Sequence, residues 1–259
     1  MSARALAIHI SFLILIACLA GCSQPPPTPS STASDADAAF TQLADEYIAG
    51  YLAWRPQTGT ALGFHQYDGK VTDYSQPSLD AELARLKSFD QRLSGVDTNR
   101  LSQQGFYDYR ILRSSIQREM FSFEQAEIYS LNPMTYAGAL DVNIYIKRDF
   151  APLEDRVRSV IAILNQAPRV TSAARTNLDE LLPRPQVETA IEQASGTADF
   201  LSKDLVAALK GVNDASLMAE FNAANSRAIS EMRGYVAYLQ QQKLPKTTDR
   251  YALGRERYQ

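Results

Sequence analysis

The chain has 259 residues, of which 45% are hydrophobic and 21% are charged, an ordinary composition for a folded globular protein. Its net charge of −3 offers no basic surface, so we expect no nucleic-acid partner. The two cysteines, Cys18 and Cys22, lie near the N-terminus, so the later sequence excludes disulfides, thiol nucleophiles and cysteine-ligated metal sites.

The first 21 residues have the pattern of a lipoprotein signal peptide. Arg4 precedes an apolar run from Ala5 to Ala20, which is shorter than the roughly 20 apolar residues of a membrane-spanning helix. The run ends in Leu-Ala-Gly-Cys, which is typical of bacterial lipoproteins and predicts a lipid on Cys22. An ordinary signal peptide with a chance cysteine is the alternative. Ser23 follows the cysteine where an aspartate would favour retention, which favours the outer membrane.

Residues 22–38 are predicted to form a lipidated cysteine followed by a disordered tether. From Gln24 to Ala38 the sequence is rich in Pro, Ser and Thr and has no apolar residue larger than alanine, so it cannot bury a core. About 15 extended residues reach on the order of 50 Å. We therefore expect a helical domain over residues 39–259 that faces the periplasm, free of the bilayer.

The first helices of this domain are predicted from apolar residues at helical spacing. One helix covers Ala39 to Trp54, and a loop follows from Thr58 to Gln76. Ser78 is the expected N-cap of a helix that ends at Gly95, and Ser102 starts a longer helix.

The central segment, residues 131–168, contains a break followed by a strong helix start. Asn132 and Pro133 interrupt the helical pattern, because proline lacks an N–H and restricts the residue before it. Pro152 suits the first turn of a new helix, which Pro168 is expected to close.

Three more helices are predicted after it. They cover Val170 to Leu182, Val187 to Lys210, and a last helix from an Asp214 cap to before Pro245. No stretch alternates with period two. The sequence thus predicts an all-α bundle or array of about seven to eight helices with no significant sheet.

Several segments resemble one bacterial envelope family, catalogued as domain of unknown function 885. They are LNPMTYAG from Leu131, RDFAPLEDRV from Arg148, VETAIEQASGTADFL from Val187, TALGFHQYD from Thr60 and YALGRERYQ from Tyr251. The resemblance implies a mostly helical protein similar to zinc metallopeptidases, which act on peptides. The family's His-Glu metal motif lies beyond the matched region, so the chain corresponds to the N-terminal half. Zinc is implied only for the full-length family, and no catalytic or metal-binding residue transfers to this chain.

Four residues are candidates for lining a cleft. His65 and Asp68 could supply two metal ligands, but zinc sites need three or four, and a hydrogen bond within a turn explains the pair better. Glu188 could pair with another carboxylate on its helix face, although solvated helices look the same. Asn132 and Tyr136 could face a cleft, but a turn-forming asparagine and a packed tyrosine are equally good explanations.

These observations lead to two functional expectations. In the first, the chain is a lipid-anchored cleft wall without the metal motif, and its own enzymatic activity is uncertain and expected to be absent in isolation. In the second, it is a complete helical lipoprotein that acts as a binding or scaffold module. If a further half exists, we expect an exposed apolar interface beside the last helix, on the stripe of Phe221, Met232 and Val236.

Overall fold

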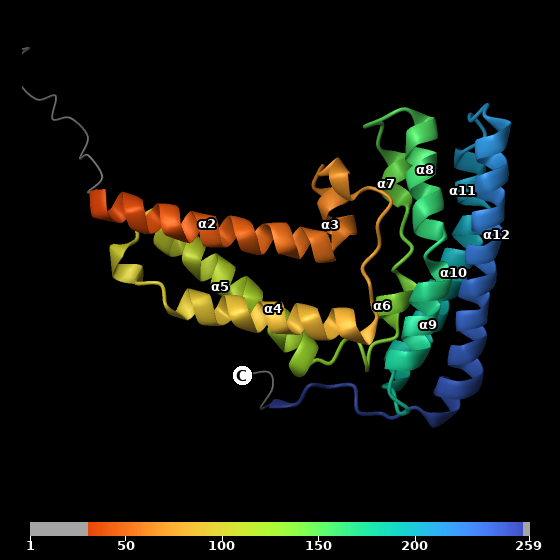
Figure 1. Cartoon of the computed structure of the whole chain (residues 1–259). Helices are drawn as coiled ribbons and strands as arrows, with labels where there is room; N and C mark the ends of the chain where they lie inside the picture. The colour runs from red at the N-terminus through yellow and green to blue at the C-terminus, as the bar shows by residue number, and fades with distance from the viewer. Residues whose placement is uncertain (1–30, 256–259) are drawn as a thin grey trace, which may run out of the picture.

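The computed structural model describes residues 31–255, which fold into helices as the sequence predicts (Figure 1). Within that range there is no strand, and Pro183 and Thr248 form an isolated bridge. None of the helices in it is long and apolar enough to cross a membrane.

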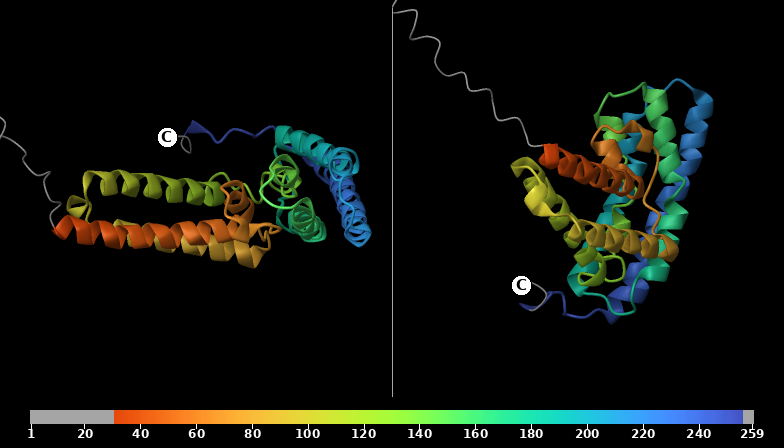
Figure 2. Two further views of the ribbon diagram at one scale, coloured as in Figure 1. Left: turned by 90° about the horizontal axis from the view of Figure 1, so that it is seen from above. Right: turned by 60° about the vertical axis from the view of Figure 1, so that its left-hand side comes forward.

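Three long helices form an elongated N-terminal unit, here called the arm. They are α2 (Ser31–Trp54), α4 (Gln76–Ser94) and α5 (Gln103–Glu124). In Figures 1 and 2 the arm projects from one side of the molecule. Its core consists of residues from all three helices: Phe40, Leu43, Tyr47, Leu86, Phe89, Leu93, Tyr109, Leu112 and Ile116. Short helices α3 (Pro56–Ala61) and η1 (His65–Tyr67) follow α2.

The remaining helices form a second unit with its own core, here called the body. It comprises α6 (Met134–Ala137), α7 (Asn143–Lys147), α8 (Leu153–Leu164), α9 (Ala167–Asn177), α10 (Arg184–Ser202), α11 (Asp204–Ala208) and α12 (Ala215–Tyr238). Helix α12 packs against α8, α9 and α10, and its Phe221 and Met232 are fully buried. The central segment packs on these helices, because α6 contacts α10 and α7 contacts α8.

Aromatic side chains join the arm to the body. Trp54, the single tryptophan, has its ring centre 6.0 Å from that of Phe123 and 5.9 Å from that of Tyr129. Tyr74 lies 6.3 Å from Tyr129 and 5.3 Å from Tyr136 by the same measure. These rings form a continuous aromatic cluster that packs the end of the arm against the body.

Helix α2 begins at Ser31, so residues 31–38 of the predicted tether are helical. They contain neither proline nor glycine, and alanine is the best helix former. The Asp37 carboxylate also accepts a hydrogen bond from the Ser102 backbone N–H at 3.0 Å, which holds this part of α2 against the start of α5.

Other predicted boundaries are wrong as well. Helix α4 starts at Gln76 rather than after Ser78, because Pro77 is tolerated in a first turn. Pro168 likewise lies in the first turn of α9, and α8 already ends at Leu164. Helix α9 in turn ends at Asn177 and not at Leu182.

The predicted helix from Val187 to Lys210 is divided into α10 and α11. The break falls at Lys203, whose φ of −119° and ψ of −68° depart from the values of a regular helix.

The expected apolar interface beside the last helix is absent from the described surface. Phe221 and Met232 of the α12 stripe are buried in the body core, and Val236 is partly buried against it. The stripe therefore serves the chain's own core.

Candidate functional site

A pocket of about 390 Å³ opens between α6, α7 and α10 and is here called the α6–α10 pocket. Its lining comes from two parts of the chain: Ala137, Gly138, Leu140, Asp141 and Asn143, and Gln193, Gly196, Thr197 and Phe200. The first part includes the end of the LNPMTYAG segment, and the second lies within VETAIEQASGTADFL. Two segments that are far apart in sequence, and that carried the family resemblance, therefore share one pocket.

Hydrogen bonds fix the rim of this pocket. Asp141 Oδ1 accepts from the backbone N–H of Asn143 at 2.9 Å and from its side-chain amide at 2.7 Å. Gln57 Nε2, from α3, donates to the carbonyls of Ala139 at 3.0 Å and Asp141 at 3.3 Å. Thr197 Oγ1 donates to the Ala137 carbonyl at 3.4 Å, which ties α10 to the end of α6.

Two glycines line the pocket without a backbone reason to be glycine. Gly138 ends α6 with φ of −91°, which any residue adopts. Gly196 lies inside α10, and a Cβ added there would meet nothing within 4 Å. A glycine inside a helix costs about 0.5–1 kcal/mol relative to alanine. Gly196 thus keeps the pocket open at some expense to helix stability.

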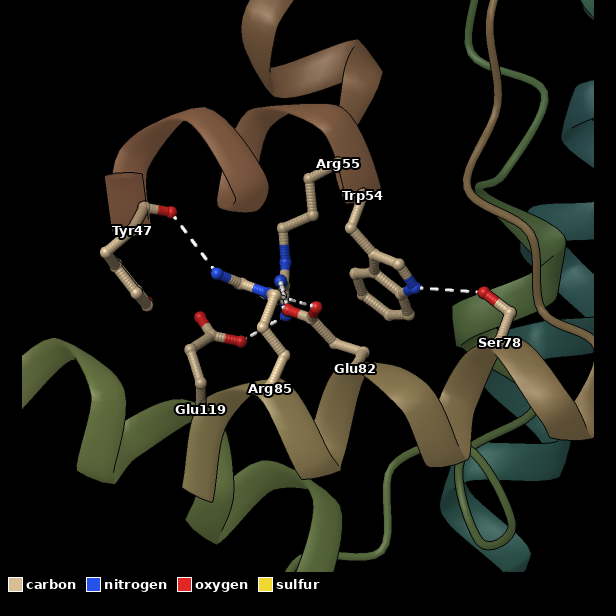
Figure 3. A network of polar contacts seen from close by, with 7 residues as sticks. All are labelled: Tyr47, Trp54, Arg55, Ser78, Glu82, Arg85 and Glu119. Carbon is tan, nitrogen blue, oxygen red and sulfur yellow. Dashed lines mark hydrogen bonds and ion pairs between the residues drawn. The ribbon is translucent and has the colours of Figure 1, made fainter. Parts of the chain in front are cut away.

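A buried ionic network lies in the arm (Figure 3). The Glu82 carboxylate is 3% exposed and accepts from Arg85 Nε at 2.7 Å and Arg85 Nη2 at 2.9 Å. Arg55 Nη1 lies 3.5 Å from Glu82 Oε1, and Arg55 Nη2 is hydrogen bonded to Glu119. Two arginines balance two glutamates here. Both carboxylates are engaged, which indicates a structural connection of α2 to α4 and α5 rather than an acid–base site.

The arm also carries an apolar groove of about 540 Å³, here called the α2–α5 groove. It runs between α2 and α5 and is closed at one end by the loop after α3. Around it lie large apolar side chains that remain exposed: Ile48 (47%), Leu62 (65%), Phe64 (46%) and Ile111 (68%). Among the described residues this groove is an exposed apolar surface, whereas the α12 stripe is buried.

His65 forms the turn contact that the sequence predicts. Its Nδ1 lies 3.0 Å from Asp68 Oδ2, and its ring stacks on Phe150 with centroids 4.1 Å apart. The imidazole therefore joins the loop after α3 to the segment before α8.

Residues 31–255 contain no group of three or more His, Cys, Asp or Glu side chains that could hold a metal. The side chains around His65 therefore do not fit a zinc site.

Asn132 and Tyr136 hold the turn that leads into α6. Asn132 Oδ1 accepts from the Met134 backbone N–H at 3.0 Å, and Tyr136 donates to the Tyr129 carbonyl at 2.6 Å. Tyr235 of α12 donates to the Pro133 carbonyl at 2.9 Å. Burial raises the pKa of Tyr136 to about 12, so its hydroxyl stays protonated as a donor. Neither side chain is among those that line the α6–α10 pocket.

Glu188 lies on the exposed face of α10, 3.5 Å from Arg184 one turn earlier, and outside the pocket. Cys22 lies outside the described residues.

Sequence reasoning did not identify Asp141, Gln193, Gly196 or Thr197 as a site. The available signal was Gly196, a glycine inside a predicted helix, within a segment that already carried the resemblance.

Comparisons with known proteins place the chain in a family. Residues 56–259 match the family described as "Bacterial protein of unknown function (DUF885)". No curated protein matches the chain. A similar solved structure is "a putative lipoprotein of unknown function" from Shewanella oneidensis, with a TM-score of 0.69 and 24% identity. The match covers 78% of this chain and 37% of that one, so the chain spans little more than a third of its neighbour's length, and at this identity the likeness concerns the fold. Because the family match covers most of its length, the chain belongs to the DUF885 family of bacterial proteins.

Proposed function

We propose that this chain is the N-terminal helical part of a lipid-anchored protein of the bacterial cell envelope, and that it forms one wall of the substrate cleft of a larger zinc metallopeptidase-like protein. The observation that carries this proposal is the α6–α10 pocket. One side includes Ala137 and Gly138 at the end of the segment 131–138, and the other side lies within 187–201, and both of these segments resemble the family. The two segments together form a concave, partly polar surface, and surfaces of this kind are suited to bind a ligand.

Two further observations support a larger protein. The match with the similar structure from Shewanella oneidensis covers only 37% of that longer chain. The α2–α5 groove exposes Ile48, Leu62 and Ile111, which a further helical segment would cover in the manner of an amphipathic helix in an apolar groove.

The anchor is the lipid on Cys22, supported by the Leu-Ala-Gly-Cys sequence and by the description of the similar structure as a lipoprotein. The helical part would then face the periplasm, and Ser23 favours the outer membrane. Zinc and the hydrolytic residues would belong to the remaining part of the larger protein. Peptides are the proposed substrates.

The anchor is tested by labelling cells with an alkyne-bearing fatty acid. We expect label on the wild-type protein and none on Cys22→Ser. Equal labelling of the two proteins would contradict the lipid anchor.

The cleft wall is tested with the protein encoded by any continuation of the reading frame after Gln259. We expect zinc-dependent hydrolysis of short peptides by that protein, loss of hydrolysis with a chelator, and no hydrolysis by residues 1–259 alone. His65→Ala should leave the hydrolysis unchanged, because His65 contacts Asp68 and Phe150 in a turn. Hydrolysis that needs His65, or a longer protein that cleaves no peptide, would overturn the proposal.

The second candidate is a complete lipoprotein that acts as a binding or scaffold module. The α2–α5 groove favours it, because an open apolar groove is also suited to a separate helical partner. A reading frame that stops after Gln259, together with a stable monomer, would favour this function over the first.

A further inference from the structure

We propose that the α6–α10 pocket is a subsite for a cationic side chain of a peptide, a lysine or an arginine, with Asp141 as its counter-charge. This inference rests on the proposed function, because it assumes a peptide ligand.

Charge is the first argument. Asp141 is the only charged side chain that lines the pocket. It belongs to none of the ion pairs formed by residues 31–255, whereas many other exposed acids of the chain are paired with a lysine or arginine. The two hydrogen bonds that it accepts from Asn143 both reach Oδ1. Its carboxylate can therefore accept from a ligand without losing its contacts to Asn143.

The polar groups around Asp141 are the second argument. An ammonium or guanidinium group has only donors, so it needs several acceptors. The pocket offers the side-chain carbonyl oxygens of Asn143 and Gln193 and the hydroxyl oxygen of Thr197. The Gln193 side chain is exposed at the pocket and is free to turn its carbonyl oxygen towards a ligand. These acceptors, with a carboxylate, match a cation better than an anion.

The third argument is the shape of the wall. Phe200 is half-buried and lines the pocket, which provides an apolar surface for the methylene stem of a lysine or arginine. Gly138 and Gly196 leave space that side chains would fill. The helical backbone at Gly196 does not itself require glycine. The absence of a side chain there therefore serves to leave the pocket open.

The test measures binding of three blocked tripeptides, Gly-Lys-Gly, Gly-norleucine-Gly and Gly-Glu-Gly, to the full chain by calorimetry. Norleucine keeps the stem of lysine and removes the ammonium group. We expect the lysine peptide to bind at least about tenfold more tightly than the norleucine peptide, since hydrogen bonds to charged groups are the strong ones. The glutamate peptide should bind most weakly, and salt should reduce both the lysine preference and the penalty on glutamate, while norleucine binding stays the same.

Three variants assign the effect. Asp141→Asn keeps an acceptor for the Asn143 N–H and should abolish the lysine preference while leaving norleucine binding unchanged. Gly196→Leu fills the pocket from a position where a Cβ meets nothing, so it should weaken all three peptides without lowering the Tm. Glu188→Gln removes an exposed acid from the same helix, outside the pocket, and should change nothing.

Equal binding of the lysine and norleucine peptides, or an unchanged preference in Asp141→Asn, would overturn the inference. Absence of binding to any peptide would overturn it too. The proposed function is tested separately. If a longer protein hydrolyses lysine and norleucine peptides equally well, the cleft-wall function is supported and only the cationic subsite is refuted.

Discussion

Tyr136 shows how a single buried hydroxyl organises the turn before the pocket. Its side chain is 1% exposed, and besides donating to Tyr129 it accepts from Asn177 Nδ2 at 3.1 Å. Burial also raises the pKa of Tyr129 and Tyr235. Each of these hydroxyls is therefore more strongly protonated in the folded state than in the unfolded chain, where tyrosine has a pKa of about 10.

Tyr136→Phe should lower the free energy of unfolding by about 1–3 kcal/mol, because the buried Tyr129 carbonyl loses its donor. Tyr107→Phe is the control, since Tyr107 is exposed. Urea unfolding measures both variants. A loss no larger than that of the control would contradict this role of Tyr136.

Stability should also depend on pH through the same tyrosine. A raised folded-state pKa gives stability that is fully present below pH of about 10 and is lost as the pH rises towards the folded value, about 12 for Tyr136. The wild type should therefore lose stability between those two pH values, and Tyr136→Phe should lose less. Parallel pH profiles for the two proteins would show that Tyr136 makes no such contribution.

At the same scale, the sequence predicted contacts that are local and missed those that are not. The pairing of His65 with Asp68 spans three residues and was expected from spacing alone. The α6–α10 pocket joins Asp141 to Gly196 across a fold whose packing no local pattern contains. Candidate residues chosen by chemical type, such as Glu188, therefore lie outside it.

Among the helices, the boundaries fixed by a side-chain cap were predicted well. Ser102 accepts from the Gly105 N–H at 3.1 Å and Asp214 from the Leu217 N–H at 3.0 Å, as their sequences indicate. Ser78 has the same local signature, yet its hydroxyl accepts from Trp54 Nε1 at 3.1 Å. Because α4 already begins at Gln76, Ser78 lies inside the helix and its hydroxyl serves a tertiary contact in place of a cap.

The connection among α2, α4 and α5 should depend on Glu82. Glu82→Gln leaves Arg55 and Arg85 without their shared carboxylate and should destabilise the protein by about 2–3 kcal/mol, somewhat less than for a fully buried charge because the arginines are partly exposed. Glu46→Gln, at the exposed pair with Arg92, should leave the Tm unchanged. Thermal unfolding of both variants tests this, and a similar Tm for the two would show that the buried network adds nothing.

For the whole molecule, amphipathic stripes predicted that helices have apolar faces but not which faces remain uncovered. The α12 stripe is covered by α8, α9 and α10. The stripes of α2 and α5 are covered by α4 on one side only, so the α2–α5 groove is left open between them. The all-α class follows from the helical periodicity of the apolar residues. The location of the exposed surface depends instead on which helices pack into the arm and which into the body.

The open groove should bind a hydrophobic fluorescent dye. Ile111→Lys places a charge in the groove wall and should reduce dye binding several-fold, whereas Leu181→Lys, at a similarly exposed aliphatic outside the groove, should not. In a longer protein whose further helices cover the groove, dye binding should be low and Ile111→Lys should instead reduce stability. A wild-type chain that binds no dye, or equal dye binding by the two variants, would mean that the groove is not the exposed apolar surface of this protein, and the larger protein would then have to meet the chain elsewhere.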